Sequence, residues 1–325
     1  MSYAKHRGGG ELFIGVDIGG TNIAVGIINS EGRILSRDET PTGVGRPFEI
    51  IIRDMAELIN RVVTGSGYKL NDINSIGIGC PGMPDNNEGT FYRVVNVGWE
   101  KAPVRPELEK YFDLPIYLEN DANAAAYAEV VAGACKGVDN SLLLTLGTGI
   151  GSGIIIGGRP YSGAHSVGGE IGHTIIQANG HLCRCGNRGC FEKYASATAL
   201  IRDGREAAQA NPESLIYRSV DGDIDQITAK TVVDAARVGD KIALKVFDQY
   251  IFYLAMGIIN IINTIDPEVI AFGGGVAKAG EFLLIPLREK VKKHIFFKTA
   301  PYAKITTAIL GNDAGIIGAA LLGKL

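Results

Sequence analysis

The chain has 325 residues, which is enough for two ordinary domains and a sizeable buried core. Hydrophobic residues make up 46% and charged residues 21%, a balance that is typical of folded globular proteins and excludes a disordered chain. The formal net charge is −3 with no long run of one sign, which argues against nucleic acid as the main partner.

The amino-terminal stretch and the hydropathy predict a cytoplasmic protein without a membrane partner. Residues Met1–Gly10 are polar, and no apolar signal-peptide segment follows them. No apolar run reaches the roughly 18–20 residues that a membrane-spanning helix needs.

Short apolar runs bounded by glycine predict β-strands. The first run, Leu12–Ile18, ends in Gly19-Gly20, which predicts a buried strand followed by a tight turn. Further strands are predicted at residues 23–28, 33–37, 75–79, 115–118, 142–146, 153–156 and 269–272.

Helical spacing of apolar residues begins at Phe48, and Gly65 and Gly67 are expected to end that helix. Further helices are predicted at residues 121–134, at about 241–265 and after Gly275. The helix at about 241–265 is apolar on nearly all sides, so we expect it to be buried between layers.

Two segments are similar and indicate an internal duplication. Residues 17–28 can be laid over residues 145–156, because both read as strand, glycine turn and strand. Few positions are identical, so chance similarity is the alternative to a duplicated half-fold whose two hairpins face one cleft. The alternation of strands and helices predicts an α/β fold with either interpretation.

Glycine-rich turns follow three predicted strands and are candidate phosphate-binding sites. No G-x-x-x-x-G-K-[ST] string occurs, so none of them is a P-loop. A glycine hairpin can still offer backbone N–H groups to phosphate, and Asp17 with Thr21 could hold a hydrated Mg²⁺. Each turn alone is more often structural, but three together favour nucleotide binding. The candidate residues are Asp17, Gly19, Gly20, Thr21, Asn22, Thr148, Gly149, Gly273, Gly274 and Gly275.

Asp121 is the candidate general base. It lies directly after a predicted strand, where α/β proteins bind ligands, and it could accept a proton from a sugar hydroxyl. The alternative is that Asp121 only caps the helix that begins there, a common role for aspartate.

A cysteine cluster is the most specific local signal. Cys183, Cys185 and Cys190 form a C-x-C-x₄-C pattern, which predicts thiolate ligands of a structural Zn²⁺ ion. A fourth ligand is needed, and spacing alone leaves both His173 and His181 open. Three free buried thiols are the alternative interpretation.

These motifs together resemble the ROK family of sugar kinases and sugar-responsive repressors, within the actin-like ATPase superfamily. The similarity covers nearly the whole chain. It is carried by the strings DIGGT (17–21), ENDANAA (119–125), TLGTGIG (145–151), GGEIGH (168–173) and CRCGNRGCFE (183–192).

The resemblance implies a role for individual residues. Asp121 would be the catalytic base, and His173 would be the fourth zinc ligand while also facing the sugar. The residues implied to bind sugar are Gly82, Asn96, Asn120, Asp121, Glu170, His173 and Glu192. Asn22 stands where many members carry Lys, so no cationic phosphate contact is expected from that position.

The family fold implies two α/β domains of the actin-like, ribonuclease H-like type, with the active site in a cleft between them. The smaller domain would comprise residues 1–118 and about 312–325, and the larger one residues 119–311 with the zinc site. Members commonly form homodimers or homotetramers, which the resemblance also implies here.

The resemblance favours an ATP-dependent glucokinase that uses Mg²⁺ with ATP and a structural Zn²⁺. GGEIGH and ENDAN are most like ROK glucokinases, while fructose, mannose, allose and N-acetylmannosamine stay open as acceptors. ROK repressors carry a DNA-binding domain of some tens of residues, and only eleven residues precede Leu12 here. A sugar-binding module without catalysis would lack the base or the phosphate turns, whereas Asp17 and Asp121 are both present.

Overall fold

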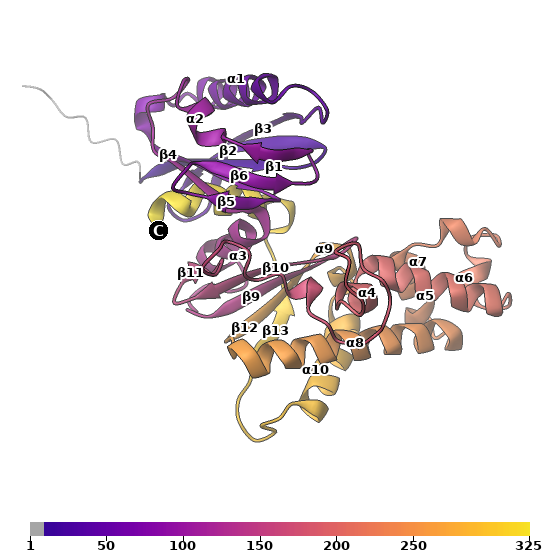
Figure 1. Cartoon of the computed structure of the whole chain (residues 1–325). Helices are drawn as coiled ribbons and strands as arrows, with labels where there is room; N and C mark the ends of the chain where they lie inside the picture. The colour runs from indigo at the N-terminus through magenta and orange to yellow at the C-terminus, as the bar shows by residue number, and fades with distance from the viewer. Residues whose placement is uncertain (1–9) are drawn as a thin grey trace, which may run out of the picture. The chain divides into compact units, whose positions relative to one another are not determined.

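The computed structural model describes residues 10–325, so the polar stretch at residues 1–9 lies outside the described residues. The chain forms two compact units (Figure 1). The first runs to Asp139 and adds residues 153–168 and 310–325, and the second comprises residues 140–152 and 169–309. The sequence placed the boundary at residue 118. The structure instead groups residues 119–139 with the first unit, because the helix that begins at Asp121 packs against the carboxyl-terminal helix.

The first unit contains a five-stranded mixed sheet in the order β3-β2-β1-β4-β8. Its strands are β1 (Leu12–Ile18), β2 (Asn22–Asn29), β3 (Ile34–Pro41), β4 (Ile73–Cys80) and β8 (Ile116–Asn120). β1, β2 and β3 pair antiparallel, whereas β1, β4 and β8 run parallel. All of the strands predicted for this unit are confirmed, and β3 extends beyond its predicted end at Arg37.

Helices cover both faces of this sheet (Figure 1). They are α1 (Phe48–Ser66), α2 (Val104–Leu108), α3 (Asp121–Ala132) and α11 (Ala314–Leu321), with 3-10 turns at Leu70–Asp72, Gly311–Asp313 and Leu322–Lys324. Alternate residues of a strand face opposite sides, so Ile14 and Val16 join the core with α1. Gly15 and Gly77 face α11 so closely that a Cβ on either would overlap its backbone.

The end of α1 corrects one prediction. The helix continues through Gly65 to Ser66, and Gly67 follows with a left-handed φ of 80°. Only Gly67 therefore acts as the stop, because glycine adopts this conformation without the steric penalty of a side chain.

A small antiparallel sheet in the first unit was not predicted. It consists of β5 (Met83–Asp85), β6 (Thr90–Val94) and β7 (Trp99–Ala102) in sequential order. Trp99 packs edge-on against Phe48 of α1, with ring centroids 5.1 Å apart.

The second five-stranded sheet has the order β11-β10-β9-β12-β13. Its strands are β9 (Ser141–Leu146), β10 (Ile150–Ile156), β11 (Arg159–Pro160), β12 (Val269–Gly273) and β13 (Lys304–Thr307). β9, β12 and β13 pair parallel. The two sheets share one strand order. In each, three consecutive strands lie side by side in reverse chain order (β3-β2-β1 and β11-β10-β9), and two later strands follow next to the earliest of the three (β4-β8 and β12-β13). The shared order supports the predicted duplication.

The second unit carries most of the helices. They are α4 (Glu192–Ala195), α5 (Ala197–Ala210), α6 (Leu215–Arg218), α7 (Ala229–Arg237), α8 (Lys241–Ile265), α9 (Gly274–Ala277) and α10 (Glu281–His294), with 3-10 turns at Ile171–His173 and Ile224–Gln226. α8 has the predicted bounds and is long and apolar enough to cross a membrane by length and composition, as some core helices are. It packs against α5, α7 and α10, but Leu244 is 41% exposed, so the expected burial between layers does not extend to every side of the helix.

Candidate functional site

The carboxyl ends of β1, β4 and β8 bring the first group of predicted site residues together. Asp17 on β1 is in register with Gly79 on β4, and Gly79 is in register with Glu119 on β8. Parallel pairing places these ends at one edge of the sheet, where α/β proteins bind ligands. Asp121 follows β8 directly, and its Cα lies 3.8 Å from where a Cβ on Gly79 would stand.

This edge is electrostatically unfavourable for negative charge. Burial, together with the negative charge of Asp121, raises the pKa of Asp17 to about 6. Burial also raises the pKa of the Cys80 thiol, and the charges of Asp121 and Asp17 add to this effect. Two carboxylates that repel each other at a sheet edge are a typical sign of a functional site, because a bound cation would relieve the repulsion.

Replacing Asp17 by Asn is expected to stabilise the protein at pH 8 and not at pH 4. A carboxyl whose pKa is raised by folding opposes folding once it is ionised, so the cost develops as the pH rises from about 4 to about 6. A difference of about two pH units corresponds to about 3 kcal/mol in the free energy of unfolding. Urea unfolding at both pH values measures the effect, with Asp113→Asn, at an exposed position of the same unit, as the control. An equal gain at both pH values would contradict the assigned cause.

Asn120, rather than Asp121, caps α3. The Asn120 Oδ1 atom accepts hydrogen bonds from the backbone N–H groups of Ala122, at 2.9 Å, and Asn123, at 3.3 Å. Asp121 is the first residue of the helix proper. Asp121 is therefore not the cap residue, although its Oδ1 atom also accepts a hydrogen bond from Ala122 N, at 2.9 Å.

Glu119 connects the segment Asn120–Asp121 to neighbouring residues, and no role for it was predicted beyond its place in the motif. Its Oε1 atom accepts hydrogen bonds from Asn120 N at 2.9 Å, Asn123 Nδ2 at 3.1 Å and Ser162 Oγ at 3.4 Å. Burial raises the pKa of Glu119, and these hydrogen bonds lower it in part. The network holds the segment on which Asn120 and Asp121 lie.

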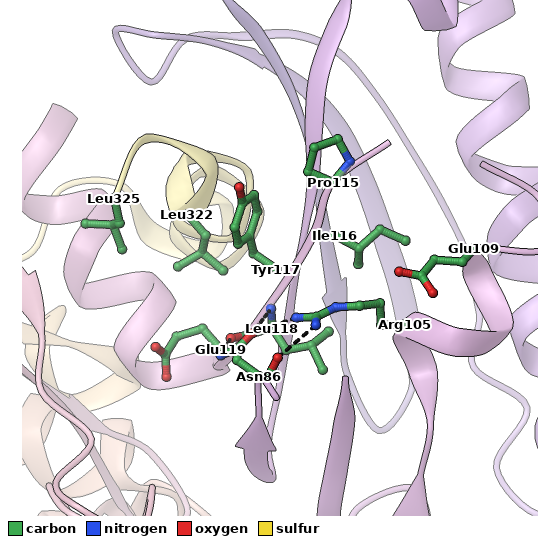
Figure 2. Close-up of a pocket in the computed structure, with 10 residues that line it drawn as sticks. All are labelled: Asn86, Arg105, Glu109, Pro115, Ile116, Tyr117, Leu118, Glu119, Leu322 and Leu325. Carbon is green, nitrogen blue, oxygen red and sulfur yellow. Dashed lines mark hydrogen bonds between the residues drawn. The ribbon is translucent and has the colours of Figure 1, made fainter. Parts of the chain in front are cut away.

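Figure 2 shows a pocket of about 600 Å³ beside the outer edge of β8. The Asn86 side chain satisfies the backbone of Leu118 at this edge: it accepts a hydrogen bond from Leu118 N at 3.0 Å and donates one to Leu118 O at 2.8 Å. Arg105 in turn donates to Asn86 Oδ1 and to Asn86 O. Neither Asp17 nor Asp121 lines the pocket, so it is not the site that the sequence predicts.

Gly82 and Asn96 lie in the first unit with the catalytic candidates. Asn120 Nδ2 donates to Gly82 O at 3.4 Å. A Cβ on Gly82 would meet Val94 at 2.8 Å, so packing against β6 already requires glycine there. Asn96 follows β6, and its Cβ lies 3.5 Å from where a Cβ on Gly20 would stand, beside the first glycine turn.

The glycine turns after β9 and β12 are neighbours in the second unit. Thr145 on β9 is in register with Gly273 on β12. Gly274 has a left-handed φ of 85°, and a Cβ there would come within 2.7 Å of the Leu146 carbonyl oxygen. The close approach explains why this junction requires glycine. The pairing of β9 with β12 places the two predicted phosphate turns that follow these strands side by side.

A pocket of about 390 Å³ adjoins Gly275, and the sequence did not predict it. It lies between the start of α5, α7 and α9, and its wall is largely apolar. The lining residues are Ala197, Thr228, Ala229, Lys230, Val233, Asp234, Arg237, Gly275, Val276, Lys278 and Ala279. Its volume lies within the range of small-molecule sites.

His173, Cys183, Cys185 and Cys190 form the metal-binding cluster. Their ligand atoms all lie within 4.8 Å of one another. Cys183 Sγ is 3.7 Å from His173 Nδ1, and Cys185 Sγ is 3.5 Å from Cys190 Sγ. A tetrahedral zinc ion with Zn–S bonds of about 2.3 Å needs sulfur atoms about 3.8 Å apart, so the four residues fit a closed structural zinc site.

The structure thus answers which histidine joins the three cysteines. His173 lies within the cluster, on the 3-10 turn Ile171–His173. His181 lies outside it: its ring packs against Tyr194 at 5.1 Å, and its backbone N–H donates to the Tyr194 hydroxyl.

Glu170 and Glu192, the carboxylates implied to bind sugar, are both held close to the cluster. The Ser152 hydroxyl donates to Gly169 O and accepts from Ile171 N at 3.1 Å, so it fixes the backbone on both sides of Glu170. Cys183 Sγ donates to Glu192 Oε1 at 3.1 Å. The other oxygen of Glu192 lies 2.5 Å from where a Cβ on Gly149 would stand. Glu192 therefore contacts both the metal-binding cluster and the predicted phosphate turn after β9.

Comparison with known proteins identifies the family. The ROK family model matches residues 13–325. The glucokinase of Thermotoga maritima is 39% identical over 312 residues, which cover 96% of both chains, and that of Halalkalibacterium halodurans is 38% identical over 313 residues, or 96% of this chain and 94% of the relative. A ROK family glucokinase from Streptomyces griseus, solved with glucose and AMPPNP, has 36% sequence identity and a TM-score of 0.78 over 96% of this chain and 99% of that chain. The chain belongs to the ROK family.

Proposed function

We propose that the protein is a sugar kinase that transfers the γ-phosphoryl group of ATP to glucose and releases glucose 6-phosphate and ADP. The observation that carries the proposal is the pair of repelling carboxylates, Asp17 and Asp121, at the carboxyl edge of a sheet in a ROK family chain. Full-length similarity to proteins named glucokinase supports glucose as the acceptor.

Asp121 is proposed as the general base. Its carboxylate would take the proton of the acceptor hydroxyl as that oxygen forms a bond to the γ-phosphorus. The bond between the γ-phosphorus and the bridging oxygen breaks, and ADP leaves with the electron pair. General-base assistance of this kind contributes a factor of about 10²–10⁴ in rate. Asn120 is the cap residue of α3, and Asp121 stands at the first helical position, directly after β8.

The glycine turns and the pocket beside Gly275 are proposed to bind ATP. The largely apolar pocket suits a nucleobase and its ribose, while the turns offer backbone N–H groups to the phosphates. Asp17 would hold a hydrated Mg²⁺ that accompanies ATP, because a half-buried carboxylate with a raised pKa gains most from a neighbouring cation. Mg²⁺ would neutralise charge on the phosphates as it develops.

Asn96, Asn120, Glu170, His173 and Glu192 are proposed to contact sugar hydroxyls, and Gly82 is proposed to let the sugar lie close to its backbone. Zn²⁺ at the cluster would act structurally, because four protein ligands leave no open position. The five cysteines form no disulfides, which suits a reducing cytoplasm, and a homodimer or homotetramer is proposed from the family resemblance.

A coupled assay of ADP release tests the proposal, with Mg·ATP as donor and glucose, mannose, fructose, allose and N-acetylmannosamine as acceptors. We expect glucose to give the highest kcat/KM. Higher kcat/KM with another hexose would keep the reaction class and replace the acceptor. No turnover with any of these sugars, for folded protein containing zinc, would contradict the kinase proposal and favour a sugar-sensing role.

A further inference from the structure

The loop after β3 forms hydrogen bonds to the first glycine turn, Gly19–Thr21. Thr42 is fully buried although it is polar and lies just beyond the end of the strand. Its Oγ1 atom donates to Gly19 O at 2.6 Å, and its backbone N–H donates to Thr21 O at 2.8 Å. Thr42 therefore binds two carbonyl groups of a three-residue turn.

These two bonds determine which way the turn presents its N–H groups. The described backbone has no cis peptide bonds, and in a trans peptide the C=O and the following N–H point in opposite directions. With Gly19 O and Thr21 O directed at Thr42, the N–H groups of Gly20 and Asn22 are directed away from it. Gly20, Thr21 and Asn22 are all exposed, so that side of the turn is open to a ligand. Such outward N–H groups bind anionic oxygens.

Thr42 is itself held by a second layer of contacts that ends on α1. Arg46 donates to Thr42 O at 3.2 Å and pairs with Asp54 of α1 at 2.7 Å. Gly43 has a φ of 64°, and a Cβ there would overlap the Arg46 guanidinium. Glycine at position 43 therefore leaves room for the Arg46 side chain against the loop and permits the left-handed backbone conformation.

We propose that Thr42 is a positioning residue for the donor nucleotide: through Gly19 O and Thr21 O it orients the N–H groups that receive the phosphates of Mg·ATP. This inference rests on the proposed function, since it assigns the turn to ATP. It gives Thr42, Arg46 and Asp54, which we call the turn anchor, a role in donor affinity and none in sugar affinity.

Thr42→Val tests the proposal because valine has nearly the shape of threonine and lacks only the hydroxyl. We expect the KM for Mg·ATP and the Kd for Mg·AMPPNP, measured by calorimetry without sugar, to rise about tenfold, or ~1.4 kcal/mol. The KM for glucose should change less than about twofold, since the variant leaves the sugar contacts intact. Thr42→Ser keeps the hydroxyl and should restore donor affinity to within about twofold of wild type.

A lower melting temperature without the selective loss of donor affinity would overturn the proposal, as would an equal loss for both substrates. If Thr42→Val does not fold, Arg46→Gln replaces it: this side chain is 40% exposed, and the change should weaken Mg·AMPPNP binding about threefold in the same selective way. Unchanged binding in that variant would also overturn the proposal.

The binding experiment separates this inference from the proposed function. Wild-type protein that binds Mg·AMPPNP but phosphorylates no hexose would contradict the kinase proposal and leave the turn anchor to be judged by its effect on binding. An active wild-type kinase whose donor affinity survives Thr42→Val would contradict the turn anchor alone. Wild-type protein that binds no nucleotide would contradict both.

Discussion

Asp121→Asn is expected to lower kcat by a factor of about 10²–10⁴ while the protein keeps its fold and its affinity for sugar and nucleotide. Asparagine is nearly isosteric with aspartate, but its amide cannot take the proton of the acceptor hydroxyl. The change leaves the start of α3 intact, because the cap at this helix is Asn120. Single-turnover measurements of ADP formation, with sugar and Mg·AMPPNP titrations alongside, separate the chemical step from binding.

The exposed Asp113→Asn variant makes the same chemical change elsewhere in the first unit and should retain full turnover. Asp121→Asn turnover within about threefold of wild type would refute the general-base assignment, since proton transfer to this side chain would then contribute almost nothing. A loss of sugar or nucleotide affinity equal to the loss of turnover would instead make Asp121 a binding residue.

The sequence predicted those parts of the fold and site that depend on neighbouring residues. Short apolar runs predicted β1, β4 and β8. Parallel pairing of these strands then brings Asp17 and Asp121 to one edge, although more than a hundred residues separate them. The cysteine cluster was predictable for the same reason, because three of its four ligands lie within eight residues.

The parts that could not be predicted depend on contacts between distant segments. Thr42 reaches Gly19 across 23 residues, and Ser162 reaches Glu119 across 43. No periodicity or spacing signals such hydrogen bonds, because a buried threonine or serine takes whichever carbonyl or carboxylate the tertiary structure supplies. The pocket beside Gly275 is similar, since its wall combines α5, α7 and α9.

Helix boundaries show a second limit. The sequence predicted Asp121 as the possible cap, although asparagine is favoured at that position as much as aspartate. Only the backbone geometry distinguishes them: Asn120 is extended and Asp121 is already helical.

The two histidines provide the sharpest test of the metal centre. His173→Ala is expected to reduce the zinc content from about one ion per chain to near zero and to lower the melting temperature, while His181→Ala should keep its zinc. His173 lies in the cluster with the three cysteines, whereas the His181 ring packs against Tyr194. Metal analysis by plasma mass spectrometry and thermal unfolding measure the two effects. Full zinc occupancy in His173→Ala would exclude this histidine as a required ligand.

Cys185→Ser extends the test to the thiolates, because Cys185 is exposed and contributes little to packing. It should lose zinc as His173→Ala does, whereas Cys135→Ala, at a buried thiol outside the cluster, should keep the metal and lose only packing energy. Zinc binding in small domains supplies about 10–16 kcal/mol. Even a quarter of that, lost from the second unit, would lower its melting temperature by about 5–15 °C. Because Cys183 contacts Glu192 and His173 ends the turn that begins beside Glu170, zinc loss should also raise the KM for glucose more than that for Mg·ATP. A zinc-free protein with unchanged sugar KM would confine the metal to stability and remove it from substrate recognition.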